Sequence, residues 1–317
     1  MRFGATLLAS ILAGCASTGP ALDEIADPAM PVRVELADVP FHPQADQQCG
    51  PAALATVLNY ASVPTTPAAL SPLVFLPVRG GSLQVELKAA ARRFDRLPYQ
   101  IEPHPGAILE QLADGRPVLV LQNLGLASRP VWHFAVVVGY DLDRDELVLR
   151  SGTDERLTMS ARSFLRSWDR ADRWALVIVE PGELPARARA DRYLEAAAGL
   201  EAAGRRTAAR HAYQRAVSAW PDESLPWLGL GNLAYFEGDL AAAVAAYRRA
   251  VEQSPRDAAA RNNLAHVLAE SGCIEAARQQ AQQALRDAGS TPLAHEIEAT
   301  LHAIAAQAPG ECRYPRE

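Results

Sequence analysis

Two stretches of the sequence decide the fold of the first half. Residues 49–58 read Cys-Gly-Pro-Ala-Ala-Leu-Ala-Thr-Val-Leu, and residues 132–141 read Trp-His-Phe-Ala-Val-Val-Val-Gly-Tyr-Asp. The first predicts a helix over 50–61, because its apolar residues recur at i, i+3, i+4 and i+7. The second predicts a strand, because apolar residues fill both of its faces. His133 falls on the face with the smaller residues.

Cys49 stands at the start of the predicted helix, and Pro51 favours a helix start there. The unpaired amides and the dipole of a helix N-terminus stabilise a thiolate by roughly 0.3–1 kcal/mol, and by up to about 2 kcal/mol in a partly buried site. This effect lowers a thiol pKa by about one unit. A nucleophilic thiol at this position therefore also needs a neighbouring base.

His133 is the predicted base. It is the one histidine among seven that falls inside a predicted strand. From the face with the smaller residues, its ring would reach a helix end packed on that face. A zinc site is not indicated, because Cys49 and His133 lack the second cysteine of the usual zinc-binding spacings. The pair predicts a thiol nucleophile with an imidazole base, and no metal or cofactor is expected.

Gln44 precedes Cys49 by five residues. Its side-chain amide can donate a hydrogen bond to the oxyanion that forms when a thiolate attacks a carbonyl. Gln47 and Gln48 are alternatives for this role.

These motifs together resemble a known family. Residues 40–44 (Pro-Phe-His-Pro-Gln), the Cys-Gly-Pro-Ala-Ala-Leu block and the later His-Phe-Ala-Val-Val-Val-Gly-Tyr-Asp block are similar to the peptidase domain that removes double-glycine leaders from bacteriocins, and to its stand-alone relatives. The resemblance covers about residues 36–180. It implies a papain-like fold, with Cys49 as nucleophile, His133 as base and Gln44 as oxyanion donor.

The sequence departs from this family at the third catalytic residue. The family places an aspartate after the strand that follows the histidine, whereas here Ser151 occupies that place. Asp154, three residues later, is the predicted orienting residue, provided that its loop folds back to the imidazole. Asp141 is another choice. Loss of an orienting group lowers the rate of such an enzyme without abolishing its chemistry.

The remaining patterns of the first half predict an α+β domain over residues 32–180. Strands are expected at 33–39, 117–122, 131–140, 146–150 and 174–179, and further helices at 82–94, 106–113 and 160–168. Residues 181–189 are expected to form a linker to the second half.

The second half repeats with a period of 34 residues. Gly204, Gly238 and Gly272 share this spacing, as do Ala216, Ala250 and Ala284. The period is typical of tetratricopeptide repeats, in which two helices form each copy. We place three copies at 190–223, 224–257 and 258–291, followed by a capping helix and tail at 292–317. Such arrays present a concave groove, so a protein or peptide partner is expected.

The N-terminus has the layout of an export signal. Arg2 precedes an apolar stretch from Ala5 to Ala13, which is too short to span a bilayer. It ends in Leu-Ala-Gly-Cys, which resembles the lipobox of bacterial lipoproteins. The resemblance implies that residues 1–14 are removed, that Cys15 carries the lipid and that residues 15–31 form a tether. Ala16 fits sorting to the outer membrane, facing the periplasm.

Net charge and cysteine content indicate which class of partner is not expected and which cysteines pair. The net charge is −6 and no basic run is present, so nucleic acid is not expected as a partner. With Cys15 lipidated, an oxidising compartment favours pairing of two of the other three cysteines. A capping helix that runs back along the third repeat would bring Cys312 near Cys273. That pairing would leave Cys49 as the free thiol.

The sequence therefore predicts an exported, lipid-anchored thiol peptidase that cleaves a peptide or amide bond, with repeats that recruit a protein partner or substrate. Acyl or amide transfer by the same pair is also open, because hydrolysis and transfer share a thioester intermediate. The alternative is a catalytically weak or silent papain-like domain that acts as a binding scaffold in an envelope assembly.

Overall fold

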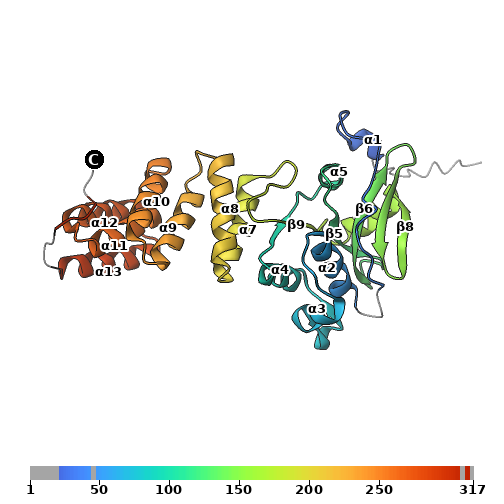
Figure 1. Ribbon diagram of the computed structural model, residues 1–317, viewed down its shortest axis with the longest axis horizontal. Helices are drawn as coiled ribbons and strands as arrows, with labels where there is room; N and C mark the ends of the chain where they lie inside the picture. The colour runs from blue at the N-terminus through green and yellow to red at the C-terminus, as the bar shows by residue number, and fades with distance from the viewer. Residues whose placement is uncertain (1–20, 44–47, 308–310, 315–317) are drawn as a thin grey trace, which may run out of the picture.

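The computed structural model describes residues 21–43, 48–307 and 311–314 (Figure 1). Cys15 and Gln44 therefore lie outside the described residues, as does the predicted signal. The described chain forms an α+β domain followed by an elongated array of antiparallel helices, which confirms the predicted fold class. Within the described residues, no helix has both the length and the apolar character needed to cross a membrane.

A seven-stranded antiparallel sheet forms the centre of the first domain. Its strands are β1 (Arg33–Glu35), β4 (Leu97–Gln100), β5 (Val118–Asn123), β6 (Trp132–Asp141), β7 (Glu146–Ser151), β8 (Asp154–Ser160) and β9 (Ala175–Val179). Their order is β4-β9-β5-β6-β7-β8, and β1 pairs with the C-terminal end of β6. The ten-residue strand β6 therefore pairs with β5 near its start and with β1 near its end.

Helices cover both faces of this sheet. One face packs against α2 (Cys49–Tyr60), α3 (Pro67–Val74) and α4 (Gln84–Arg93). The other face packs against α5 (Pro105–Ala113), α6 (Ala161–Asp169) and the short α1 (Leu22–Ile25). A small hairpin of β2 (Phe75–Leu76) and β3 (Gly81–Ser82), joined by the 3-10 turn η1 (Pro77–Arg79), lies between α3 and α4 in the chain.

The two faces of β6 differ from the prediction in one respect. Helix α2 packs on the bulkier face, against Phe134, Val136 and Val138. Ala135 and Val137 instead face the side of α5 and α6, so the expectation that the cysteine helix would pack on the face of His133 is wrong. Large apolar side chains supply the contact area that a buried helix needs, which favours the bulkier face. His133 is the second residue of β6 and therefore lies at the end of the sheet.

Several elements are absent from the prediction or have different bounds. Strand β1 ends at Glu35, and α4 begins at Gln84 because Gly81–Ser82 pairs with β2. Helix α3 and strands β4 and β8 were not predicted. Strand β8 reads Asp-Glu-Arg-Leu-Thr-Met-Ser and lies at the sheet edge, where exposed polar residues weaken the hydrophobic signal.

The predicted tether is packed onto the domain over residues 21–31. Leu22 is buried in the core, and its backbone N–H donates to Asp145 Oδ1 at 2.9 Å. The hydroxyl of Tyr140 donates to the carbonyl of Pro31 at 2.9 Å. The tether prediction fails here because a few apolar residues in a proline-containing segment suffice to bury it.

The second half consists of seven helices in the described residues. They are α7 (Ala190–Ala202), α8 (Arg206–Ala219), α9 (Leu225–Phe236), α10 (Leu240–Gln253), α11 (Ala258–Glu270), α12 (Ile274–Ala288) and α13 (Leu293–Ala305). Gly204, Gly238 and Gly272 lie between the two helices of each hairpin with φ of 72°, 78° and 78°. Only glycine enters this left-handed region without strain, which explains its recurrence every 34 residues.

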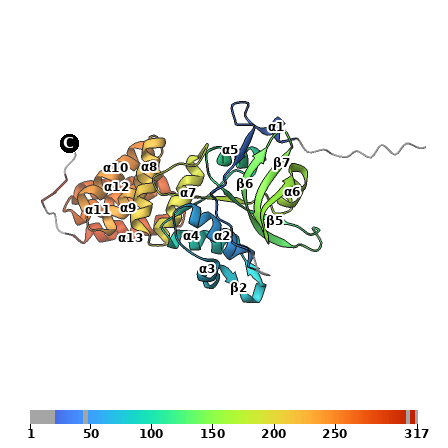
Figure 2. The same ribbon diagram turned by 45° about the vertical axis from the view of Figure 1, so that its right-hand side comes forward.

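The two halves share one hydrophobic core. Tyr193 and Leu200 of α7 belong to the same buried cluster as Leu97 and Tyr99 of β4. The residues of the predicted linker are also fixed, since Gln111 Nε2 donates to the carbonyl of Ala186 at 2.9 Å. Both views show α7 beside α4 at this junction (Figures 1 and 2). The first repeat is therefore built onto the α+β domain.

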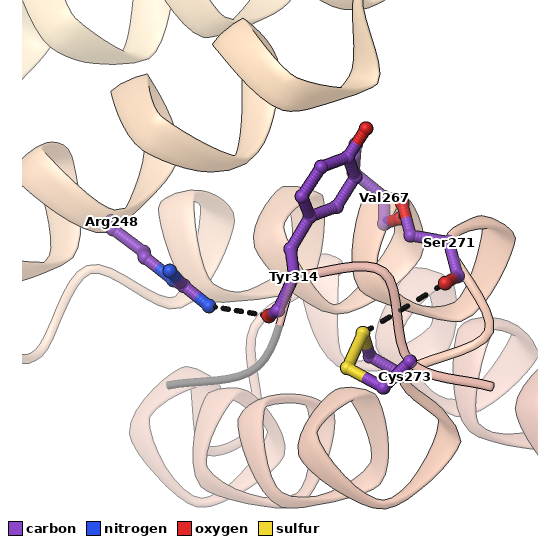
Figure 3. The surroundings of a disulfide bond; sticks show 6 residues. Arg248, Val267, Ser271, Cys273 and Tyr314 are labelled. Atoms are coloured by element: carbon purple, nitrogen blue, oxygen red, sulfur yellow. Dashed lines mark hydrogen bonds between the residues drawn. A yellow bond between two sulfur atoms is a disulfide. The ribbon is translucent and has the colours of Figure 1, made fainter. Parts of the chain in front are cut away.

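A disulfide joins Cys273 to Cys312 at the far end of the array. Cys273 lies at the turn between α11 and α12, and Cys312 follows the capping helix α13 in the chain. Figure 3 shows the disulfide at Cys273, beside Ser271. Arg248 of α10 donates to the carbonyl of Tyr314 at 2.8 Å, and the N–H of Arg313 donates to the carbonyl of Ser271 at 3.2 Å. The disulfide and these bonds hold the tail against the third repeat, and Cys49 is the free cysteine of the described residues.

Candidate active site

Cys49 and His133 line one cleft of about 850 Å³ in the first domain. The cleft is lined by the start of α2 and by the β2–β3 hairpin with its continuation to Gln84. The start of β6 and the turn after α6, at Ala171 and Asp172, also line it. Two motifs 84 residues apart in the sequence therefore meet at the same end of the sheet.

The thiol of Cys49 belongs to the first residue of α2, which is half-buried. The rest of the first turn is buried, which fixes the helix end in the domain. Gly50 leaves room for Ser82, because a Cβ at this position would lie 2.3 Å from Ser82 Oγ. The amides of this first turn provide the partial positive charge that stabilises a thiolate.

The ring of His133 is held by Ser151. Its Nε2 lies 2.9 Å from Ser151 Oγ, and Ser151 is the buried last residue of β7. Burial lowers the pKa of His133, so the neutral ring is favoured. Within the described residues, Nδ1 makes no hydrogen bond, and none joins His133 to Cys49. Nδ1 is thus the ring nitrogen that remains available to a thiol.

The structure does not bring the two aspartates to this histidine. Asp154 is the exposed first residue of β8, and no hydrogen bond or ion pair joins it to His133 in the described part of the chain. Asp141 lies at the opposite end of β6, where it pairs with Arg33 and Arg144. Asp154 pairs with Ser151 across a two-residue turn, and of these two residues it is Ser151 that contacts Nε2.

The sequence analysis did not place the other lining residues in this cleft, among them Trp132, Ser82 and Asp172. Trp132 directly precedes His133 and is about half exposed, which is unusual for a tryptophan in a sheet. Its place next to His133 in the sequence is the signal that could have assigned it to the cleft. Ser82 and Asp172 reach the cleft through tertiary folding alone. The hydroxyl of Ser82 is buried and has no hydrogen-bond partner among the described residues.

A second concave site lies on the helical array, with a volume of about 500 Å³. Three of the residues that line it are joined by side-chain hydrogen bonds. Asn232 Oδ1 accepts from the hydroxyl of Tyr247 at 3.0 Å and from Asn263 Nδ2 at 3.3 Å. Arg206 lies over the ring of Phe236, with 3.3 Å between the guanidinium carbon and the ring centroid. The groove thus offers amides, a cation and an exposed aromatic ring.

The family model described as tetratricopeptide repeat matches residues 194–258 and 228–292. The helical array consists of tetratricopeptide repeats. Together the two matches span α8 to α12 and most of α7. No curated protein sequence matches the chain.

Solved structures with a similar fold exist for both parts of the chain. A candidate C39-like peptidase from Bacillus anthracis is 18% identical, with 46% of this chain and 97% of that chain covered and a TM-score of 0.41. The type III secretion translocator chaperone SycD of Yersinia enterocolitica is also 18% identical, covering 36% of this chain and 82% of its own, with a TM-score of 0.34. The TPR2B domain of yeast Sti1, solved as a pHsp70 complex, is 15% identical, covering 38% of this chain and 98% of its own, with a TM-score of 0.36.

Proposed function

We propose that this chain is an exported, lipid-anchored thiol peptidase whose repeats recruit a protein partner or substrate. One observation carries the catalytic part of the proposal. Cys49 at the N-terminus of α2 and His133 at the start of β6 line one cleft, and Ser151 holds the Nε2 atom of His133. The similarity of the sequence motifs to peptidases that remove double-glycine leaders supports the same assignment.

The proposed reaction begins when His133 Nδ1 accepts the proton of the Cys49 thiol. The thiolate attacks the carbonyl carbon of the scissile bond, and the carbonyl oxygen becomes an oxyanion. Amides of the first turn of α2 stabilise this charge, and we assign Gln44 as a further donor. The imidazolium returns the proton to the leaving amine, so a thioester on Cys49 remains. Water, activated by Nδ1, then releases the acid and restores the thiol.

Ser151 orients the ring without adding charge. A carboxylate at this place would stabilise the imidazolium, whereas a hydroxyl fixes the ring through a hydrogen bond alone. Because burial also lowers the pKa of His133, the ion pair of thiolate and imidazolium is less favoured than it would be beside an aspartate. We therefore propose an enzyme of modest turnover. An amine that replaces water in the last step would give acyl transfer by the same residues.

A scaffold with a weak or silent thiol site is the second candidate. The groove over α9 and α11 favours it, because this groove presents amide and aromatic side chains independently of Cys49. Both candidates use the repeats to bind an extended segment of a protein. They differ in whether Cys49 forms a covalent intermediate.

The test compares the parent protein with the Cys49→Ala variant on a library of fluorogenic peptides. We expect cleavage by the parent and at least a roughly thousandfold loss in the variant, because the nucleophile is removed. An unchanged circular dichroism spectrum would show that the fold remains. Equal cleavage by the two proteins would overturn the nucleophile assignment. A parent protein that neither cleaves nor forms a covalent adduct with a vinyl sulfone probe would favour the scaffold.

A further inference from the structure

Exposed apolar side chains concentrate beside the cleft. Nine large apolar side chains are exposed in the described residues, and six of them lie on two segments that border this site. The first segment carries Val78 and Val85, next to the cleft residues Arg79 and Gln84. The second carries Leu124, Leu126, Val131 and Trp132. Clustered exposed apolar groups on a soluble domain mark a binding surface.

The second segment, residues 124–132, is called the β6 rim below. It is a structured loop rather than a loose connection. The buried side chain of Asn123 accepts hydrogen bonds from the N–H groups of Gly125 and Val131, both at 3.0 Å. The carbonyl of Asn123 accepts from Arg170 Nη2 at 2.8 Å. These bonds hold the rim in one shape while its apolar side chains point outward, so the exposure is built into the fold.

The position of His133 indicates which half of a substrate meets the β6 rim. The histidine must touch the leaving nitrogen to protonate it, so the leaving half of the substrate passes along the wall that carries His133. Trp132 is adjacent to His133 on β6, and it lines the same cleft. The rim is therefore continuous with the leaving-group side of the cleft.

A bilayer is the other surface that could bind such a rim, but the rim lies far from the point where the described chain begins. The described chain begins at the opposite end of β6, where Leu22 is bonded to Asp145 in the turn after that strand. The rim precedes the first residue of β6. Ten residues of strand at about 3.3 Å each separate the two ends by roughly 30 Å. A protein anchored through Cys15 would thus direct the rim away from its own membrane.

We propose that the β6 rim, with Trp132 at its centre, binds a large apolar side chain in the leaving half of the peptide substrate. This inference rests on the proposed thiol peptidase function. We assign the preference to two residues of the rim. Trp132 is about 54% exposed and directly precedes His133, and Leu126, about 70% exposed, is the most exposed large apolar side chain of the rim. Burial of these side chains on binding would supply the selectivity.

The competition of amines for the acyl-enzyme tests this preference directly. The p-nitrophenyl ester of N-acetylglycine acylates Cys49, and p-nitrophenolate leaves. The thioester is then attacked by water, giving the acid, or by an added amino-acid amide, giving a dipeptide amide. Either attack frees the thiol. We expect leucinamide and phenylalaninamide to trap the acyl group at least roughly tenfold better than serinamide. The Trp132→Ala variant should lose most of this difference.

The matched control is Leu225→Ala, which removes an equally exposed apolar side chain from the repeats. It should keep the parent ratio. The burst of p-nitrophenolate should be the same in the parent protein and in Leu225→Ala, and a burst of any size in Trp132→Ala shows that this variant is folded and acylated. A burst without selectivity among the amines, or selectivity unchanged in both Trp132→Ala and Leu126→Ser, would overturn the inference alone. No burst in the parent protein would overturn the proposed function as well. Co-sedimentation of the lipid-free protein with phosphatidylglycerol vesicles, lost in Leu126→Ser, would assign the rim to a bilayer instead.

Discussion

Ser151 fixes His133 by a hydrogen bond at a place where a carboxylate would add charge stabilisation. The resemblance to leader peptidases and the residue spacing both pointed to this position. The expectation that Asp154 would fold back failed, because residues 152–153 form a tight turn and Asp154 starts the next strand. The structure places Cys49 and His133, the two residues singled out from the sequence, in one cleft. The sequence alone does not show that the hydroxyl of Ser151 contacts the ring of His133 and that the carboxylate of Asp154, beyond a two-residue turn, does not.

Removal of the Ser151 hydroxyl should slow the enzyme without stopping it. We expect Ser151→Ala to lower kcat/KM by about fivefold, because the loss of one hydrogen bond of roughly 1 kcal/mol frees the ring to rotate. Asp154→Asn is the matched control and should remain within twofold of the parent. Steady-state kinetics on one peptide would check both. A larger loss in Asp154→Asn than in Ser151→Ala would return the orienting role to Asp154.

At the scale of elements, strong periodic patterns predicted helices and strands correctly, whereas short or polar strands were not predicted. Helix α2 and strands β5, β6 and β7 lie within two residues of their predicted bounds, because each carries a run of buried apolar residues. Strand β4 contains Pro98 and β8 is polar, so neither gave a signal. The packing partner of each β6 face was also misjudged, since a strand pattern does not say which helix covers which side.

The repeats were predictable for a different reason. Gly204, Gly238 and Gly272 each adopt a positive φ between two helices, so the 34-residue period of the fold is visible in the sequence. The close approach of helices adds a second constraint. A Cβ at Gly231 would lie 2.4 Å from the ring of Tyr247, so this site requires glycine for packing.

The disulfide should contribute to the stability of the last repeat. Cys273 and Cys312 are 39 residues apart, and closing a loop of this length stabilises by roughly 4 kcal/mol in the chain-entropy model. We expect the double variant Cys273→Ser, Cys312→Ser to unfold at lower urea concentration than the parent, with the change confined to the array. Cys49→Ser is the control and should match the parent. A double variant as stable as the parent would show that the helices alone fix the capping end.

At the scale of the whole molecule, the junction makes the cleft and the groove parts of one body. Arg205 after α7 forms two hydrogen bonds of 2.6 Å with the carboxylate of Asp95, which follows α4. This bonding and the positive charge of Arg205 lower the pKa of Asp95 below its usual 3.8. The contribution of the pair is therefore present above pH 3.8 and is lost as the pH falls through the lower pKa of the folded state. Its partly exposed position limits it to about 1 kcal/mol.

The placement of the chain start predicts the consequence of losing the anchor. We expect Cys15→Ser to move the exported protein from the membrane fraction to the soluble periplasmic fraction and to abolish labelling with a palmitate analogue. Catalysis should persist, because the described chain packs onto the domain from Leu22 onward, at the end of β6 far from His133. Fractionation with immunoblotting would check the location. Continued membrane association of Cys15→Ser would contradict a lipid anchor at this residue.

The pH dependence of Cys49 alkylation tests the central claim most directly. With Cys273 and Cys312 in a disulfide, the rate at Cys49 can be followed by iodoacetamide and peptide mass spectrometry. If His133 activates the thiol, the parent protein should react well near pH ~6.5. His133→Ala, in which only the helix N-terminus favours the thiolate, should reach the same rate about one pH unit higher. The same pH profile in both proteins would contradict a Cys49–His133 pair.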